Sequence, residues 1–404
     1  MDRVKVAGIS EKIVEYGFCA LIFFLPISKA LTESVAGLII LGFIIKEIAV
    51  YDRPENNTSS DILWLLGALF VFNAFSLINS GPLLLKSLKT LFSKWTEYFL
   101  LLIIAADHFR SAERVRRFFY FFLLSACLVG CSSLSQKFFG FEFLRNRGMP
   151  WAGVTGPFEN PNSLSSYIVL GLPIVAAMGF WGWKPKAARI AVFLTSIILS
   201  IALLLTFSRS GLLGFFLAFL IMILLFRKRK FLLIMFFLSL TGLFAAPFKG
   251  ELTKLFDNGT DTYRFAIWQS AFGMIREHPF LGMGLGTFMD HFYHYMPPGI
   301  LSMDVYYAHN CYLQIWAEAG ALTLAVFLVL VALVLGRGTR SAFINRGSDS
   351  GILLGGLTAG LGGFLAASFF DNQLYSVQLS VLFWTMLGIA VALEHNLAEK
   401  DLAS

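Results

Sequence analysis

Charged residues are scarce in this sequence. Of its 404 residues, 14% are Asp, Glu, Lys or Arg, whereas 57% are hydrophobic. Soluble domains average about a quarter charged residues, so this composition excludes an ordinary water-soluble domain as well as a disordered chain. Apolar runs of about 16–22 residues recur instead, each long enough to cross a hydrocarbon core of roughly 30 Å. The composition therefore indicates a protein with several membrane-spanning segments.

Cysteines, metal-binding motifs and basic stripes are also few or missing. The four cysteines form no CxxC pair, so the sequence predicts neither a disulfide framework nor a cysteine-based metal site. The predicted outer loops hold no DxD or HExxH motif, so we expect no metal and no cofactor. The formal net charge is +7, but no basic stripe alternates with exposed aromatic residues, so we expect no nucleic acid as a partner.

The apolar runs predict an all-α fold, because a chain inside hydrocarbon must satisfy its own backbone hydrogen bonds and the short alternating segments of a barrel are missing. We expect a polytopic integral membrane protein of about twelve transmembrane helices, in a single membrane domain that covers residues 1–404. The predicted spans are residues 15–31, 34–50, 62–79, 91–106, 118–138, 163–182, 189–206, 211–226, 231–247, 319–336, 351–369 and 374–392.

Basic residues gather at alternate ends of these spans. The clusters are Arg3, Lys5 and Lys12; Arg110, Arg114, Arg116 and Arg117; Lys184, Lys186 and Arg189; RKRK at 227–230; and Arg337, Arg340 and Arg346. By the positive-inside rule this side faces the cytoplasm, so both termini are predicted to be cytoplasmic. The segment 248–318, between the ninth and tenth spans, is then a large loop on the outer side.

This loop is far longer than an ordinary connection, so we expect it to be functional. Residues 261–279 predict an amphipathic helix, with apolar residues at helical spacing and Pro279 after its end. A second helix begins near His309 and continues into the tenth span. The loop is therefore predicted to carry amphipathic helices along the membrane surface.

Three basic groups share the predicted outer face. Arg209 lies in LTFSRSGLLG between the seventh and eighth spans, Arg264 in the first turn of the loop helix, and His309 at the start of the second helix. Two guanidinium groups near a helix N-terminus suit a dianion. Where nucleotides are scarce, we expect this dianion to be a lipid-linked sugar pyrophosphate. A neutral His309 could then accept a proton as a base.

Each group also has a structural explanation. Arg209 could extend to lipid phosphates, Arg264 could contact lipid headgroups, and His309 could anchor the chain at the interface. Other polar residues share the outer face. Asn160 and Asn162 lie in GPFENPNSL (156–164), which suits sugar hydroxyls or a helix start capped by Asn162 or Ser163. Asp371, in SFFDNQL (368–374), could orient His309, hold an acceptor or end a helix.

Four motifs carry a resemblance to a known family. They are GPFENPNSL at 156–164, TFSRSGLLG at 206–214, RFAIW…HPFLGMGLGTF at 264–288 and AHNCYLQIWAEAG at 308–320. In this order and topology, the chain resembles the bacterial O-antigen ligase family, within a superfamily shared with O-antigen polymerases. The resemblance implies a GT-C-like, metal-independent glycosyltransferase of the bacterial inner membrane with its active site facing the periplasm. It would move O-antigen polysaccharide from undecaprenyl pyrophosphate to a lipid A–core sugar, with inversion of the anomeric centre.

The resemblance also implies roles for individual residues. Arg209 and Arg264 correspond to the family's arginines and His309 to its histidine, while Asp371 corresponds more loosely to an aspartate near the last spans. Their expected partners are the lipid-linked donor, the lipid A–core acceptor and membrane lipids, with no nucleotide. The predicted substrate-binding residues are Arg209, Arg264, Asn310, Asp371, Asn160, Asn162 and Trp268.

Two alternatives stay open. An O-antigen polymerase would use the same chemistry with a second lipid-linked repeat as acceptor. A flippase or other transporter of lipid-linked oligosaccharides belongs to a different class. It is disfavoured because the span interiors are nearly free of charge and no internal repeat is evident.

Overall fold

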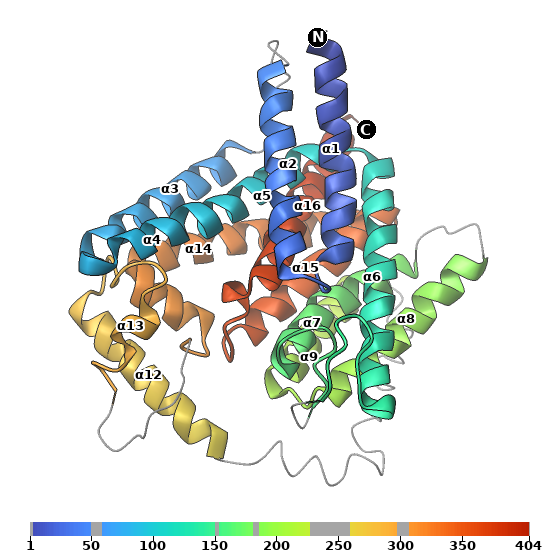
Figure 1. Ribbon diagram of the computed structural model, residues 1–404. Helices are drawn as coiled ribbons and strands as arrows, with labels where there is room; N and C mark the ends of the chain where they lie inside the picture. Colours follow the sequence, from blue (N-terminus) through green and yellow to red (C-terminus); the bar gives the residue numbers. More distant parts are fainter. Residues whose placement is uncertain are drawn as a thin grey trace.

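Figure 1 shows the computed structural model, which describes residues 3–49, 59–149, 153–180, 186–226, 259–296 and 307–403. In these ranges the regular elements are helices, apart from an isolated bridge between Glu142 and Arg147. The all-α prediction is confirmed. The α-helices are α1 (Arg3–Phe24), α2 (Lys29–Ala49), α3 (Ser60–Ser76), α4 (Leu84–Thr90), α5 (Thr96–His108), α6 (Ala112–Phe139), α7 (Pro161–Met178), α8 (Lys186–Leu205), α9 (Arg209–Leu225), α12 (Gly259–Glu277), α13 (Phe288–Phe292), α14 (Cys311–Ile344), α15 (Asp349–Ala367) and α16 (Val377–Ala403).

Short helical turns join some of these helices. The 3₁₀ turns are η1 (Leu77–Asn79), η2 (Gly81–Leu83) and η6 (Gln373–Tyr375), and η3 (Leu91–Trp95) is a π-helical turn. Every predicted span overlaps a described helix except the ninth, residues 231–247, which lies outside the described residues. The number of spans therefore stays a prediction.

Among the described residues, seven helices are long and apolar enough to cross a membrane. In their most apolar windows, α7, α15 and α16 are 83%, 78% and 89% buried, whereas α3 and α14 are 28% and 39% buried. The first three therefore form the centre of the bundle, and α3 and α14 present their apolar side chains outwards. The chain is a multi-pass membrane protein.

Glycine lets α15 approach its neighbours closely. A Cβ atom added to Gly360 would lie 2.3 Å from the Leu170 carbonyl oxygen, and one added to Gly363 would lie 2.5 Å from the Gly214 carbonyl oxygen. Small residues favour helix association in membranes because they let two backbones pack together. Since Gly214 lies near the start of α9 and Gly363 near the end of α15, these two helix ends lie side by side.

Ion pairs and hydrogen bonds join the helices at one end of the bundle. Arg114 pairs with Glu11, Arg117 with Glu15, and Lys46 with Asp107 at 3.0 Å. Arg337 pairs with Asp61, and the Asn396 side-chain amide donates to the Arg110 carbonyl oxygen at 2.9 Å. We call this end the basic end; Figure 1 shows the two chain termini there.

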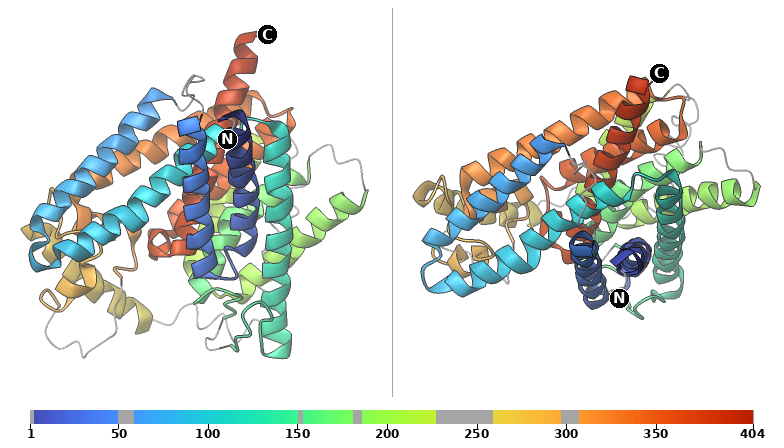
Figure 2. Two further views of the ribbon diagram at one scale, coloured as in Figure 1. Left: turned by 45° about the horizontal axis from the view of Figure 1, so that its top comes forward. Right: turned by 90° about the horizontal axis from the view of Figure 1, so that it is seen from above.

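Contacts at the opposite end come from the other ends of the same helices. Lys29, which begins α2, pairs with Glu159 just before α7, and Gln378 of α16 donates to the Leu25 carbonyl oxygen after α1. Asn79, after α3, donates to the Gly282 carbonyl oxygen at 2.8 Å. Figure 2 shows α3, α5 and α14 running side by side towards α12 and α13. We call this end the loop end, because it carries the described part of segment 248–318.

A glycine-rich turn fastens the loop to α14. The amides of Met283 and Gly284 donate to the carbonyl oxygens of Ala317 and Glu318, each at 2.9 Å. α14 kinks at Gly320, where φ is +83° and an added Cβ would lie 2.0 Å from the Phe280 carbonyl oxygen. Only glycine allows this close approach without strain. The predicted loop helix is present as α12, and α14 begins just after His309 and continues as a long apolar helix, as expected from the sequence.

Candidate functional site

His309 and Asp371 form the centre of the candidate site. The His309 Nδ1 atom lies 3.0 Å from Asp371 Oδ1, although 62 positions separate the two residues. A carboxylate only accepts hydrogen bonds, so Nδ1 carries a proton in this contact, and of the two neutral tautomers the contact selects the one with its lone pair on Nε2. The histidine side chain is 40% exposed and the aspartate side chain 13%. The histidine can therefore meet a substrate while the carboxylate stays behind it.

The backbone around His309 is held on both sides. His309 has φ +49°, in the left-handed region that most side chains avoid. Before it, the Ala308 amide donates to Gln314 Oε1 at 2.6 Å. After it, Asn310 caps α14, and its Oδ1 accepts from the Tyr312 and Leu313 amides at 2.9 and 3.1 Å. Such strain costs about 1–3 kcal/mol and persists where the surroundings fix the backbone, as they do here.

Several groups hold Asp371 in its ionised form. Burial opposes ionisation, but the hydrogen bond and charge of His309, the Asn372 amide and the charge of Arg264 together lower the pKa of Asp371 below its usual value. Asp371 Oδ1 also accepts from the Asn372 amide at 2.8 Å, and Oδ2 from Gln373 Nε2 at 3.3 Å. The carboxylate is therefore suited to orient His309 and to stabilise its protonated form.

Arg264 acts on the same carboxylate. It lies on α12, where it is half-buried, and its charge is one cause of the lowered pKa of Asp371. One turn further along α12, Trp268 Nε1 donates to the Ala308 carbonyl oxygen at 3.0 Å, and its ring packs edge-on against Phe369. Trp268 therefore fastens the loop helix to the segment that carries His309.

Arg209 reaches the loop end at the start of α9. Ser208 caps this helix, and its Oγ accepts from the Gly211 amide at 3.1 Å. The Ser208 hydroxyl donates to Asn162 Oδ1 at 2.7 Å, and the Asn162 carbonyl oxygen accepts from Gln373 Nε2 at 3.4 Å. Because Gln373 also bonds to Asp371, a continuous series of hydrogen bonds runs from the start of α9 to Asp371 and, through it, to His309.

The structure thus brings the predicted residues to one end of the bundle, with different kinds of contact. His309 and Asp371 touch, Arg264 interacts electrostatically with Asp371, and Arg209 lies next to Ser208 in the hydrogen-bonded series. The other predicted residues, Asn160, Asn162, Trp268 and Asn310, hold parts of the protein together. Their contacts with a substrate stay predictions.

The cap of α7 differs in detail from the expectation. The sequence predicted Asn162 or Ser163 at this position, but Asn160 is the cap, and its Oδ1 accepts from the Ser163 amide at 2.8 Å. The reason is Pro161, which has no amide hydrogen to lose and fits the first helical position. Asn162 is thereby released from capping and contacts Ser208 instead.

Three polar residues near the site were missed by sequence reasoning. Gln373 bonds to Asp371, Gln314 accepts from the amide of Ala308, and Glu318 accepts from Gln314 Nε2 at 2.9 Å. Gln314 and Glu318 are one turn apart in the AHNCYLQIWAEAG motif, and both are buried in an otherwise apolar segment. That isolated polar pair is the signal that could have identified them.

Among the described residues, no group of three or more His, Cys, Asp or Glu side chains is arranged to hold a metal ion. The expectation that the site works without a metal stays a prediction. The candidate donor-binding cations, Arg209 and Arg264, are guanidinium groups, which donate to phosphate oxygens through a planar fork.

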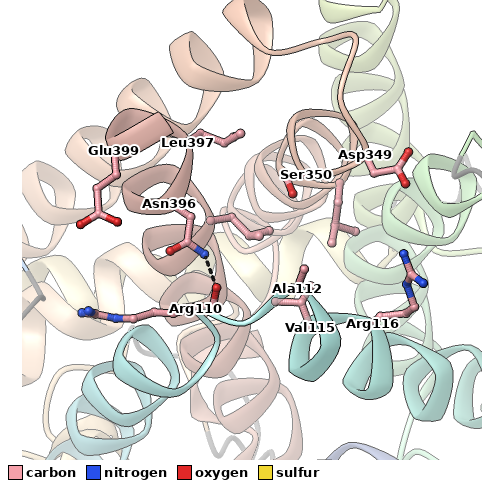
Figure 3. Close-up of a pocket in the computed structure, with 11 residues that line it drawn as sticks. Arg110, Ala112, Val115, Arg116, Asp349, Ser350, Asn396, Leu397 and Glu399 are labelled. Atoms are coloured by element: carbon pink, nitrogen blue, oxygen red, sulfur yellow. Dashed lines mark hydrogen bonds between the residues drawn. The ribbon is translucent and has the colours of Figure 1, made fainter. Parts of the chain in front are cut away.

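A cavity of about 410 Å³ lies far from this site (Figure 3). Arg110 and Arg116 line it together with Asp349, and the hydrogen bond from Asn396 to Arg110 lies in its wall. Asp349 begins α15, whereas Asp371 follows the end of that helix. The 19 residues of α15 span about 28 Å, so this cavity belongs to the basic end and takes no part in the site.

Comparison with known proteins agrees with the motifs. Residues 194–328 match a family model described as O-Antigen ligase. This stretch contains Arg209, Arg264 and His309, whereas Asp371 lies beyond it. A comparison with curated proteins gives no match. The resemblance found in the sequence is therefore confirmed over the part of the chain that carries three of the candidate residues.

Proposed function

We propose, from the match of residues 194–328 to the O-antigen ligase family model, that the chain transfers O-antigen polysaccharide from undecaprenyl pyrophosphate to a lipid A–core sugar. The family includes ligase-like and polymerase-like glycosyl transfer, and both use a lipid-linked donor. We further propose that the reaction takes place at the periplasmic face of the bacterial inner membrane. The basic end then faces the cytoplasm, as the positive-inside rule requires, and the loop end faces the periplasm.

The observation that carries this proposal is the contact between His309 and Asp371 next to the charge of Arg264. A histidine oriented by a carboxylate is suited to act as a general base. A base, a buried carboxylate and cationic groups at one end of a membrane bundle together match the needs of glycosyl transfer from a lipid pyrophosphate. A transporter would need no such base.

In the proposed reaction, His309 Nε2 removes the proton from the acceptor hydroxyl. The oxygen attacks the anomeric carbon of the donor sugar, and a new carbon–oxygen bond forms as the bond to the pyrophosphate breaks. The electron pair of the broken bond stays on the pyrophosphate oxygen. Arg209 and Arg264 bind this leaving group and stabilise its growing charge. The anomeric centre is inverted, and undecaprenyl pyrophosphate remains in the membrane.

The test is complementation of a bacterial strain that lacks the native gene. His309→Ala, Arg209→Ala and Arg264→Ala are expected to abolish polysaccharide-capped lipopolysaccharide on gels while long polymer accumulates on the lipid carrier. His294→Ala is the matched control, since His294 is an exposed histidine of the same loop. Normal capping by all three variants would exclude this site.

The same lipopolysaccharide gel distinguishes a ligase from a polymerase and from a transporter. If the variants instead shorten the polymer to one repeat on an otherwise capped core, the chain is a polymerase. If polymer fails to reach the periplasm at all, the chain acts in transport. Each outcome therefore supports a different one of the three candidate functions.

A further inference from the structure

A second cavity opens beside the candidate site at the loop end. It has a volume of about 380 Å³, within the range of roughly 300–1,000 Å³ typical of small-ligand sites. The π-helical turn η3 and the start of α5 form one side, the glycine-rich turn before α13 another, and α14 with η6 the third. None of the residues assigned above to catalysis or donor binding lines it.

Aromatic and polar side chains alternate around this cavity. Trp95 and Tyr98 form the inner wall with 6% and 5% exposure, and Tyr307 and Tyr375 stand on the facing side with ring centroids 6.0 Å apart. Gln314 and Glu318 also line the cavity, but both are 1% exposed and bond to each other, whereas Tyr307 is 39% exposed. An exposed tyrosine can pack its ring on the apolar face of a sugar and bond to a sugar hydroxyl through its own hydroxyl, so Tyr307 and the aromatic walls around it suit a saccharide.

Two lysines give one side of the cavity a positive charge. Lys86 pairs with Asp290, which holds α4 against α13, whereas Lys94 is an exposed residue of the π-helical turn. A π-turn in an α-helix changes the direction of the side chains that follow, and such turns are frequent at functional sites. Lys94 is therefore placed to meet an anionic group on whatever enters the cavity.

Hydrogen bonds connect the cavity to the candidate base. Gln314 lines it, and its Oε1 accepts from the Ala308 amide at 2.6 Å and from Asn372 Nδ2 at 2.7 Å. Ala308 precedes His309, and Asn372 follows Asp371. Gln314, in the wall of the cavity, therefore holds both the residue before His309 and the residue after Asp371.

The cavity lies on one side of the segment that carries Asp371, and Arg209 lies on the other side. Asn372 faces the cavity through Gln314, whereas Gln373 faces Asn162 and the start of α9. In an inverting transfer, the attacking hydroxyl and the leaving group approach the anomeric carbon from opposite sides. If Arg209 binds the leaving pyrophosphate, the acceptor arrives from the side of the cavity.

We propose that this cavity binds the acceptor saccharide, with a phosphate of that saccharide held by Lys94 and a sugar ring packed against Tyr307. The inference rests on the proposed glycosyl transfer and adds the acceptor subsite to it. It makes Lys94 a determinant of acceptor affinity that takes no part in the bond-breaking step.

The test uses the full-length protein in nanodiscs with lipid-linked polysaccharide as donor. The acceptor is rough lipopolysaccharide, either with its core phosphates or after chemical dephosphorylation. Lys94→Ala should raise KM for the phosphorylated acceptor about tenfold, as expected for loss of one charge-assisted hydrogen bond, and leave kcat and the donor KM within about twofold. Lys94→Arg should retain most of the acceptor affinity.

Lys89→Ala is the matched control, because Lys89 is an exposed lysine of the adjacent helix α4 that does not line the cavity. The inference is overturned if Lys94→Ala changes the donor KM or kcat instead of the acceptor KM, or if Lys89→Ala has the same effect. It is also overturned if dephosphorylation leaves the effect of Lys94→Ala unchanged in size.

Two further arms separate this inference from the proposed function. Titration of rough lipopolysaccharide without donor measures acceptor binding alone; binding that depends on Lys94 without any transfer by the wild type would contradict the glycosyl transfer and leave the subsite. Transfer by the wild type with an acceptor KM that Lys94→Ala leaves unchanged would support the glycosyl transfer and overturn the subsite. In nanodiscs without anionic lipid, the Lys94 effect should persist, whereas its disappearance would identify a membrane headgroup as the occupant and overturn the inference.

Discussion

At the scale of single residues, the proposed chemistry depends on the hydrogen bond between Asp371 and His309. Asp371 is buried, yet its pKa is lowered by His309, the Asn372 amide and Arg264, so it remains a carboxylate. A carboxylate behind the ring fixes the tautomer that exposes Nε2 as a base and stabilises the imidazolium after proton transfer. In the proposed reaction, Asp371 therefore positions His309 and does not meet the reacting atoms.

Asp371→Asn is expected to reduce kcat by about 100-fold or more, because an amide can stabilise the wrong tautomer, and to leave both KM values almost unchanged. Since the pKa of Asp371 lies below its usual value, its titration should add no acid limb to the pH profile of kcat/KM between pH 5 and 9. The measurement is steady-state kinetics of the purified wild type and variant. Equal rates for both proteins would contradict the assigned role.

At the scale of elements, the glycine-rich turn and the kink of α14 set the position of the site. Glu318 accepts from the Gly286 and Phe288 amides at 3.0 and 3.2 Å, and the turn pairs with α14 through the amides of Met283 and Gly284. These contacts hold the described part of the loop against the helix that begins next to His309. A substitution that changes the kink should therefore also displace residues of the candidate site.

Gly320→Ala places a methyl group 2.0 Å from the Phe280 carbonyl oxygen at a residue with φ +83°. We expect a loss of stability of more than about 1 kcal/mol and a fall in activity, because the turn must move away from α14. Gly336→Ala on the same helix is the matched control, since an added Cβ there meets nothing within 4 Å. Thermal unfolding in detergent and transfer assays measure both effects; equal behaviour of the two variants would contradict this view of the kink.

The sequence predicted more of the elements than of their contacts. Apolar length was enough for the helices, and the position of His309 before a long apolar run was enough for the start of α14. The pairing of His309 with Asp371 was only one of several options, since 62 positions separate them and the contact depends on how α14 and α15 meet. The π-turn at Leu91–Trp95 and the kink at Gly320 result from tertiary packing, which local pattern does not encode.

At the scale of the whole molecule, the bundle has two chemically different ends. Ion pairs such as Arg114 with Glu11 join helices at the basic end. The loop end gathers the candidate base, the buried carboxylate and the two cavity-lining lysines. Such a division is what a membrane enzyme needs if its substrates reach it from one side only.

The predicted orientation is open to a direct test. Green fluorescent protein fused after Ser404 should fluoresce, because green fluorescent protein folds in the cytoplasm but does not fold after export in unfolded form. Alkaline phosphatase fused after Phe370, between α15 and α16, should be active, since it needs the periplasm. The opposite pattern of fluorescence and phosphatase activity would reverse the orientation and remove the periplasmic site.

The central claim is that one base, His309, held by Asp371, serves glycosyl transfer at this end of the bundle. Its most direct test is transfer in vitro, with purified protein, lipid-linked polysaccharide and rough lipopolysaccharide as the components. The wild type should form capped lipopolysaccharide without added metal, and His309→Ala should lower the rate by at least about 100-fold while the donor still binds. Transfer by His309→Ala at the wild-type rate would contradict the account.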